Sequence, residues 1–345
     1  MSAHSQHLIV STGRSDWTSR IENEQDTAVW GKFTADVKSM LGRKGEFFDP
    51  YHNDAMVSTS SFTPLELAER EANLHKSSGR PTASVQAQKT VDALLFPAFK
   101  HFKNLTTTPA AGGGRDDDDE PGHSHNNART LIRSSLLPEK DRLNKVYNTL
   151  SESERTSKSR DPSLAASLDA TPIQVPTILI CSHGQRDHRC GVLGPLLHDE
   201  FARYISSRTT SSYDEEAGSM RIRAAATGAF VASAPASPSS DSPGRRPGSE
   251  IPVNIGMISH IGGHKWAGNV IMYIPPGMQM QMQMQSPLHV ADGPRPHPLA
   301  GKGIWYGRVE PRHVEGIIEQ TLVRGNVIRE LFRGGLSAQG EVLRL

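Results

Sequence analysis

Cysteine is scarce in this sequence, and long apolar runs are missing from it. Only two of the 345 residues are cysteines, too few for the disulfide framework of a small secreted domain. No apolar run approaches the ~20 residues that a membrane-spanning helix needs. The first residues lack the apolar stretch and cleavage site of a secretory signal peptide. These absences argue against a secreted disulfide-rich domain and predict no membrane span.

An excess of one charge is also absent. The chain has 38 basic and 37 acidic residues and a net charge of +1, so neither nucleic acid nor a membrane surface is expected as a partner. Hydrophobic content of 36% and aromatic content of 6% are low for a compact protein, which predicts unstructured segments. No catalytic triad, P-loop or dinucleotide fingerprint stands out, nor do paired carboxylates suited to glycoside hydrolysis.

Composition divides the chain into three parts. Residues 1–105 predict a small α/β region, residues 106–173 a low-complexity and largely disordered linker, and residues 174–335 a second α/β domain. The linker holds three consecutive glycines, an acidic run and at most one helix, near 136–150. Two surface insertions are expected in the last domain, near 231–250 and 277–300.

Apolar periodicity and helix-start signals predict the elements. Strands are expected at 7–11, 175–180, 220–224, 253–258, 270–274 and 303–309, with a buried segment at 91–96. Helices are expected to begin near Pro64, Pro195 and Pro311, because proline is favoured at the first helical position. A further short helix is expected between Asn326 and Gly334, capped by these two residues.

The chemistry of the chain is concentrated in two short segments. Both cysteines lie in one loop, Cys181-Ser-His-Gly-Gln-Arg-Asp-His-Arg-Cys190, directly after an expected strand. Seventy residues later comes His260-Ile-Gly-Gly-His264. Two thiolates and two imidazoles form a complete set of four ligands for one metal centre. Cys181, Cys190, His260 and His264 are therefore the candidate ligands.

Zinc and an iron–sulfur cluster are the main candidate occupants. The two histidines suit zinc, but structural zinc usually takes cysteines two to four residues apart, and here eight residues separate them. A loop of that length can wrap a larger object, such as a [2Fe–2S] cluster. Two thiolates and two imidazoles would bring the oxidised core from about +2 to about 0, which raises the reduction potential to roughly −150 to +300 mV.

The spacing is not that of an ordinary Rieske domain, in which each cysteine has a histidine close by. Cys181-Ser-His183 resembles half of that pattern, whereas Cys190 is followed by Gly-Val-Leu. His183 is therefore interpreted as a neighbour of the ligands. Arg186, Arg189 and Lys265 add positive charge, which favours the reduced state and an acidic partner.

Two other classes of function remain open from the residues alone. Cys181 and Cys190 could be the working pair of a thiol–disulfide oxidoreductase or redox chaperone, although C-x-x-C is the usual redox spacing. Alternatively, the four ligands could hold zinc in an interaction module. An electron carrier or redox protein is favoured over an enzyme that converts a substrate.

Several blocks of the chain, in order, resemble the sucrase/ferredoxin-like family. They are GRSDW (13–17), ICSHGQRDHRCGVLGPLL (180–197), SHIGGHKWAGNV (259–270), GIWYGRV (303–309) and LFRG (331–334). Their order and closeness are most similar to the family's fungal branch, the altered inheritance of mitochondria group. Several linked blocks are more specific than one motif.

The resemblance implies a thioredoxin-like ferredoxin fold in the C-terminal half and a [2Fe–2S] cluster. Cys181 and Cys190 would be its thiolate ligands, and His260 and His264 its imidazole ligands. The resemblance further implies electron transfer or redox homeostasis with a redox partner protein. A mitochondrial location is implied too, with the cytoplasm as the alternative.

Overall fold

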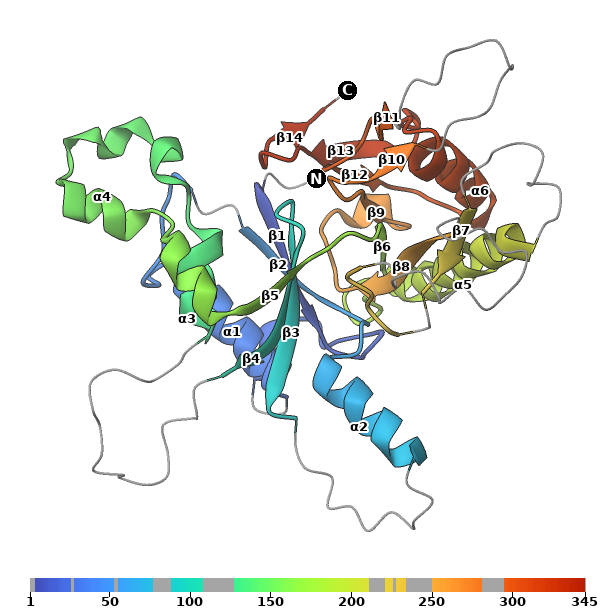
Figure 1. Ribbon diagram of the computed structural model, residues 1–345, viewed down its shortest axis with the longest axis horizontal. Helices are drawn as coiled ribbons and strands as arrows, with labels where there is room; N and C mark the ends of the chain where they lie inside the picture. Colours follow the sequence, from blue (N-terminus) through green and yellow to red (C-terminus); the bar gives the residue numbers. More distant parts are fainter. Residues whose placement is uncertain are drawn as a thin grey trace, which may run out of the picture.

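The computed structural model describes residues 4–25, 28–52, 55–76, 88–107, 127–210, 221–225, 228–233, 250–280 and 295–344 (Figure 1). Within them the chain is mixed α/β, as the sequence predicts. One twelve-stranded sheet has the order β14-β13-β12-β9-β6-β8-β2-β1-β3-β4-β5, and β7 pairs with β8 off this path. Strands β10 and β11 form a separate two-stranded sheet. No helix in these residues is long and apolar enough to cross a bilayer.

The strands are β1 (Gln6–Ser11), β2 (Ala55–Ser60), β3 (Thr90–Phe96), β4 (Lys100–Thr106), β5 (Asp169–Pro172), β6 (Thr177–Cys181), β7 (Arg221–Ala224), β8 (Glu250–Ile258), β9 (Val270–Tyr273), β10 (Gln279–Met280), β11 (Arg295–Pro296), β12 (Gly303–Tyr306), β13 (Phe332–Leu336) and β14 (Val342–Leu343). The α-helices are α1 (Val29–Leu41), α2 (Leu65–Lys76), α3 (Asn127–Leu131), α4 (Glu152–Lys158), α5 (His188–Thr210) and α6 (Val314–Ile317). The 3-10 segments are η1 (Ile21–Glu24), η3 (Lys140–Arg142), η4 (Lys145–Thr149), η5 (Pro162–Ser167), η7 (His264–Trp266) and η8 (Pro311–His313), and the π-helical turns are η2 (Ile132–Leu136) and η9 (Ile318–Val323).

The N-terminal half of the sheet is built on β1. This strand pairs in parallel with β2 and antiparallel with β3, and η1 and α1 connect β1 to β2. Leu8, Ile9 and Val10 are all fully buried, as expected for an inner strand that is covered on both faces. Leu8 and Val10 pack toward α1 and α3, whereas Ile9 packs toward the other half of the sheet.

The C-terminal half repeats this plan around β6. Strand β6 pairs in parallel with β8 and antiparallel with β9, and β9 pairs antiparallel with β12. Helix α5 follows β6, and α6 with η9 follows β12. Ile178 and Ile180 face these helices, whereas Leu179 and Cys181 point to the opposite face.

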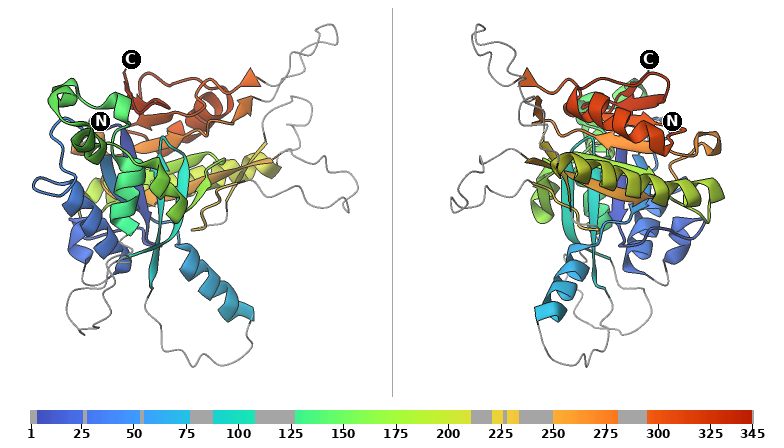
Figure 2. Two further views of the ribbon diagram at one scale, coloured as in Figure 1. Left: turned by 60° about the vertical axis from the view of Figure 1, so that its left-hand side comes forward. Right: turned by 90° about the vertical axis from the view of Figure 1, so that its right-hand side faces the viewer.

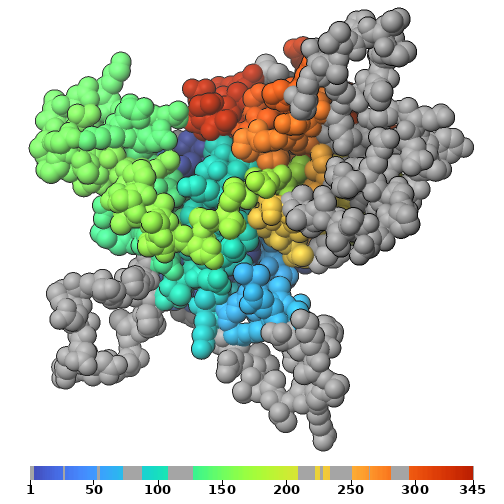
Figure 3. Space-filling view, viewed as in Figure 1, coloured from blue at the N-terminus to red at the C-terminus, as the bar shows by residue number. Residues whose placement is uncertain are grey.

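The two half-sheets therefore pack against each other, and each carries its own helices on the outside (Figures 1 and 2). Between them lies a central apolar cluster to which both halves contribute. The rings of Phe96 and Tyr273 stack across this cluster at 3.8 Å. In Figure 3 the teal atoms of β3 and β4 border the orange atoms of the C-terminal half.

The half-sheets are joined by one antiparallel residue pair, Ser60 with Ile258. These residues end β2 and β8, so the carboxyl ends of the two strands meet there. Because β1 runs parallel to β2 and β6 runs parallel to β8, the loops after β1, β6 and β8 converge at this junction. The candidate ligand segments are two of these loops.

The prediction of a mostly disordered linker is wrong for residues 127–172. They form α3 through η5 and then β5, which pairs with β4. Three of their side chains are buried in the core beside α1, those of Leu131, Ile132 and Leu136. These few apolar side chains are scattered among polar residues, so composition did not reveal their core contacts. Residues 108–126 of the linker lie outside the described residues, as do 234–249 and 281–294 of the expected insertions, and the domain boundaries stay a prediction.

Two helix predictions also need correction. Helix α5 begins at His188 rather than near Pro195, because the Asp187 side chain accepts a hydrogen bond of 3.1 Å from the Arg189 amide and caps the helix. The segment between Asn326 and Gly334, predicted as a helix, is instead a loop that leads into the first residues of β13. Pairing of β13 with β12 determines its conformation, which local capping signals did not indicate.

Candidate metal centre

Three of the four candidate ligands come together in the structure. Cys181 ends β6, Cys190 lies in the first turn of α5, and His260 follows β8. One ligand atom from each of the three lies within 4.8 Å of the others. Both cysteines are fully buried and unpaired by a disulfide, and His260 is half-buried. The site lies in the central cluster between the half-sheets.

The fourth candidate, His264, begins the short helix η7 four residues after His260. Its side chain lies outside the described residues. Gly262 and Gly263 connect the two histidines with φ angles of +85° and +79°, in the left-handed region that favours glycine. A Cβ atom on Gly263 would lie 2.7 Å from the Trp266 ring, so this turn also needs glycine for space.

Helix α5 lies close against the cysteine loop, which fixes where Cys190 points. A Cβ atom on Gly194 would lie 2.5 Å from the Cα of Ser182, and one on Gly191 would lie 2.7 Å from the Cα of Gly184. The backbone amide of Cys190 donates to the Asp187 carbonyl at 2.9 Å. The second sulfur is therefore held on the first turn of a helix that begins inside the loop.

His183 supports the site rather than contributing a ligand. Its Nε2 lies 3.0 Å from the Trp17 carbonyl and 2.9 Å from the Thr18 carbonyl, so Nε2 carries the proton and donates. Its Nδ1 accepts the backbone amide of His260 at 3.0 Å. Both ring nitrogens are thus occupied by protein groups, in agreement with the interpretation from sequence. Burial lowers the pKa of His183, which keeps the ring neutral.

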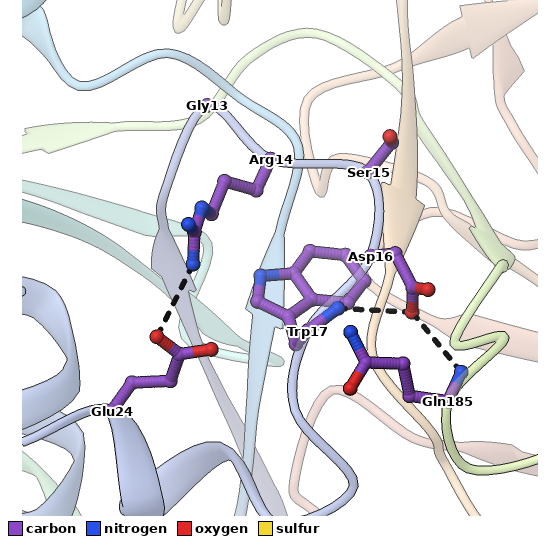
Figure 4. A pocket seen from close by; sticks show the side chains of 7 residues that line it. All are labelled: Gly13, Arg14, Ser15, Asp16, Trp17, Glu24 and Gln185. Carbon is purple, nitrogen blue, oxygen red and sulfur yellow. Dashed lines mark hydrogen bonds and ion pairs between the residues drawn. The ribbon is translucent and has the colours of Figure 1, made fainter. Parts of the chain in front are cut away.

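The loop after β1 clamps the cysteine loop from the N-terminal side. The Ser182 hydroxyl donates to the Ser15 carbonyl at 2.6 Å, and the backbone amide of Gln185 donates to Asp16 Oδ1 at 3.4 Å. Figure 4 shows Asp16 between the amides of Trp17 and Gln185, beside a cavity of about 400 Å³ that the seven labelled residues line. The GRSDW block therefore positions the ligand loop, a role its sequence did not suggest.

The two sulfur atoms are electrostatically coupled. A hydrogen bond between them lowers the pKa of the Cys181 thiol and raises the pKa of Cys190, so the pair releases its protons in two separate steps. A hydrogen bond with the His260 side chain acts on Cys190 in the opposite direction. The first proton leaves more readily than the second, and a bound cation would favour the loss of both.

Arg333 and Asn269 complete the site, and sequence reasoning missed both. The Asn269 carbonyl accepts the Cys181 amide at 3.0 Å, and the Asn269 side chain accepts a hydrogen bond from Arg333. The Arg333 guanidinium also lies 3.4 Å from the Gly262 carbonyl. Its charge faces Cys181, although burial lowers the pKa of Arg333. The LFRG block was the only signal that could have pointed to this arginine.

The donor set fits a metal centre. Two ligands 2.3 Å from one tetrahedral ion lie about 3.8 Å apart, within the span of this group. Two buried donors beside the site, Asn269 Nδ2 and Arg333 Nε, have no hydrogen-bond partner among the residues that the structure describes. Such donors are costly unless an acceptor arrives, and thiolate or sulfide sulfur is one such acceptor. Soft thiolates with imidazole suit zinc, copper or iron–sulfur chemistry.

Comparisons with known proteins identify a family and several relatives of this chain. A profile of the family described as sucrase/ferredoxin-like matches residues 1–334. The chain is similar to the altered inheritance of mitochondria protein 32 of Meyerozyma guilliermondii, with 29% identity over 59% of this chain and 49% of that protein. For the protein of the same name from Clavispora lusitaniae the identity is 30%, over 60% of this chain and 52% of the relative. The chain spans about half the length of these curated relatives. No solved structure matches it.

Proposed function

The chain belongs to the sucrase/ferredoxin-like family, and we propose that it binds a [2Fe–2S] cluster as an electron carrier or redox sensor. Cys181 and Cys190 would be the thiolate ligands, and His260 and His264 the imidazole ligands. The observation that carries the proposal is the convergence of Cys181, Cys190 and His260 in a buried site at the junction of the half-sheets. Family membership was predicted from the sequence blocks.

We propose a thioredoxin-like arrangement for the C-terminal half. The strand order β12-β9-β6-β8, with β6 parallel to β8 and the other neighbours antiparallel, supports it. So does the placement of one helical segment after β6 and another after β12. In this arrangement the ligand-bearing loops follow the two parallel strands.

The bound cluster would supply reversible one-electron chemistry near neutral overall charge. The protein would hold the cluster, orient its ligands and shield it from water. Burial of both sulfur atoms excludes water from the thiolate side. His183 fixes the backbone that presents His260, and Arg333 brings positive charge toward Cys181, which favours the reduced state.

A thiol–disulfide oxidoreductase is the second candidate, because the two thiols share a hydrogen bond and only one has a lowered pKa. Their complete burial opposes it, since a disulfide substrate must contact the attacking sulfur directly. An electron carrier has no such requirement. Zinc would satisfy the same ligands but would leave the long cysteine loop unexplained.

A mitochondrial role is also part of the proposal. The curated relatives are named for altered inheritance of mitochondria, and their names alone support this assignment.

Metal analysis after anaerobic purification tests the cluster. We expect coloured protein with about two iron and two labile sulfide per chain, and loss of both in Cys181→Ser and Cys190→Ser. His188→Ala, an exposed histidine of the same loop, is the matched control and should retain iron. Colourless protein with stoichiometric zinc would reject the cluster. Metal-free protein that forms a reversible disulfide would favour the oxidoreductase.

A further inference from the structure

Three cations gather around one tryptophan next to the histidine ligand segment. The Arg308 guanidinium lies 4.7 Å from the Trp266 ring centroid, that of Arg333 5.4 Å, and the Lys265 ammonium 5.6 Å. Lys265 and Arg308 are exposed, whereas Trp266 and Arg333 are half-buried. We call these four residues the Trp266 patch.

The patch carries positive charge that no described carboxylate balances. Ion pairs are found for Arg189 with Asp187 and for Arg312 with Glu310, but none for Lys265, Arg308 or Arg333 in the described ranges. Like charges held this close repel one another, and attraction to the ring face offsets the repulsion only in part. A surface of this kind attracts an anion.

The patch also lies directly on the ligand segment. Trp266 ends the helix η7 that begins at His264, and its ring contacts the position of Gly263. Arg333 reaches the Gly262 carbonyl and the side chain of Asn269, whose carbonyl accepts the Cys181 amide. The patch is therefore connected through Arg333 to the backbone that carries the candidate ligands.

We infer that the Trp266 patch is the docking surface for the acidic face of a redox partner protein. The inference rests on the proposed electron-carrier function and names the chemistry of the partner. Exposed cations around a half-buried aromatic ring combine electrostatic steering with an anchor of the kind that dominates protein interfaces. A partner docked here would lie next to the His260–His264 segment, which would supply the imidazole ligands of the proposed cluster. Arg189, which lies near the cysteines, contributes less because Asp187 neutralises its charge.

Three single variants with the same change of net charge test the surface. Lys265→Glu and Arg308→Glu alter the patch. Lys302→Glu is the control, because Lys302 directly precedes β12 whereas Arg308 follows the other end of this strand. Binding of a fluorescein-labelled decaglutamate peptide to the full chain is measured by anisotropy at low salt. Each patch variant should weaken binding about fivefold or more, and Lys302→Glu less than twofold, because the loss is local. Equal losses in all three variants, no binding by the wild type, or tighter binding of a labelled ten-nucleotide DNA would overturn the inference.

A kinetic experiment links the patch to the cluster. In stopped-flow mixing, one electron passes from the reduced protein to ferricyanide, which becomes ferrocyanide. The patch variants should slow this reaction and reduce its dependence on salt, while leaving oxidation by cationic hexaammineruthenium(III) unslowed. Equal effects on both oxidants would contradict the inference. Protein that holds no iron would contradict the proposed function and not the docking surface. The peptide experiment would then test the Trp266 patch independently.

Discussion

At the scale of single residues, His183 is the link between the N-terminal loop and the ligands. It donates to the carbonyls of Trp17 and Thr18 and accepts the amide of His260. If His260 binds the proposed cluster, its position depends through the backbone on His183, a residue that is not itself a ligand. Because His183 is neutral and buried, its contribution is geometric rather than a matter of charge.

Replacing His183 should therefore loosen the site without removing a ligand. His183→Ala leaves the His260 amide and two carbonyls without their partner, which we expect to lower the free energy of unfolding by about 1–3 kcal/mol. Iron occupancy should fall, and the spectrum of the remaining cluster should change as His260 reorients. Urea unfolding and visible spectra check this, with His188→Ala as control. Full iron occupancy with an unchanged spectrum would show that His183 does not position His260.

The sequence singled out Cys181, Cys190 and His260 as candidate ligands because their residue types and grouping are chemically unusual. It did not identify Arg333 or Asn269, because arginine and asparagine are common and their role comes from contacts across strands. Because Cys190 lacks the nearby histidine of a Rieske pattern, the sequence indicated that His183 is a neighbour of the ligands. Its two carbonyl partners could not be inferred from the sequence.

At the scale of elements, the start of α5 decides the position of Cys190. The helix packs on the cysteine loop through glycines, so the absence of a Cβ atom at these positions matters more than their low helix propensity. Gly194→Ala would place a Cβ atom 2.5 Å from Ser182, and backbone must then shift. We expect a loss of about 1–3 kcal/mol in the free energy of unfolding and lower iron occupancy.

Gly316→Ala in α6 is the matched control for this substitution. The nearest atom to its Cβ would be Ile328 Cδ1 at 3.9 Å, so the same added methyl group should be neutral or slightly stabilising there. Urea denaturation of both variants measures the change in the free energy of unfolding that each substitution causes. Equal stability of the two would contradict close packing of α5 on the cysteine loop.

Elements with a strong apolar pattern could be predicted from the sequence, and those set by distant contacts could not. The apolar run before Cys181 forms β6, and the expected strand at 270–274 forms β9. Residues 326–334 carried helix-like signals, but the last of them belong to β13 and pair with β12. Helix α1 went unpredicted, although Trp30, Phe33 and Val37 bury one face of it.

At the scale of the whole molecule, His7 ties the half-sheets together. Its Nδ1 lies 2.8 Å from the Tyr273 hydroxyl and its Nε2 lies 2.6 Å from the Ser58 hydroxyl. Burial, with a smaller contribution from His4, lowers the pKa of His7 well below 6.5. The ring therefore stays neutral in the folded protein at pH values where an unfolded chain takes up a proton.

This depressed pKa predicts the direction of a pH effect. Above about pH 6.5 His7 is neutral in both states and adds no pH dependence; below it the unfolded chain binds the extra proton, so stability falls. Between pH 7.5 and 5.5 His7 alone should account for a loss of about 1.4 kcal/mol. Urea unfolding of wild type and His7→Gln at both pH values isolates this contribution. An equal loss in both proteins would rule out His7 as its source.

The packing of two half-sheets face to face could not be predicted from the sequence. Composition suggested separate regions joined by a linker, whereas one sheet runs through both. The connection depends on a single strand pair and on a core assembled from residues such as Ile9, Phe96 and Tyr273, far apart in the chain. Local patterns carry no information on which faces meet.

Pulsed EPR of the reduced protein tests the proposed ligation most directly, because it detects nitrogen nuclei bound to a paramagnetic cluster. We expect a [2Fe–2S] signal with strong coupling to two imidazole nitrogens. In His264→Cys we expect coupling to one nitrogen and a lower reduction potential. A reduced protein without a cluster signal, or a cluster signal without nitrogen coupling, would contradict ligation by Cys181, Cys190, His260 and His264.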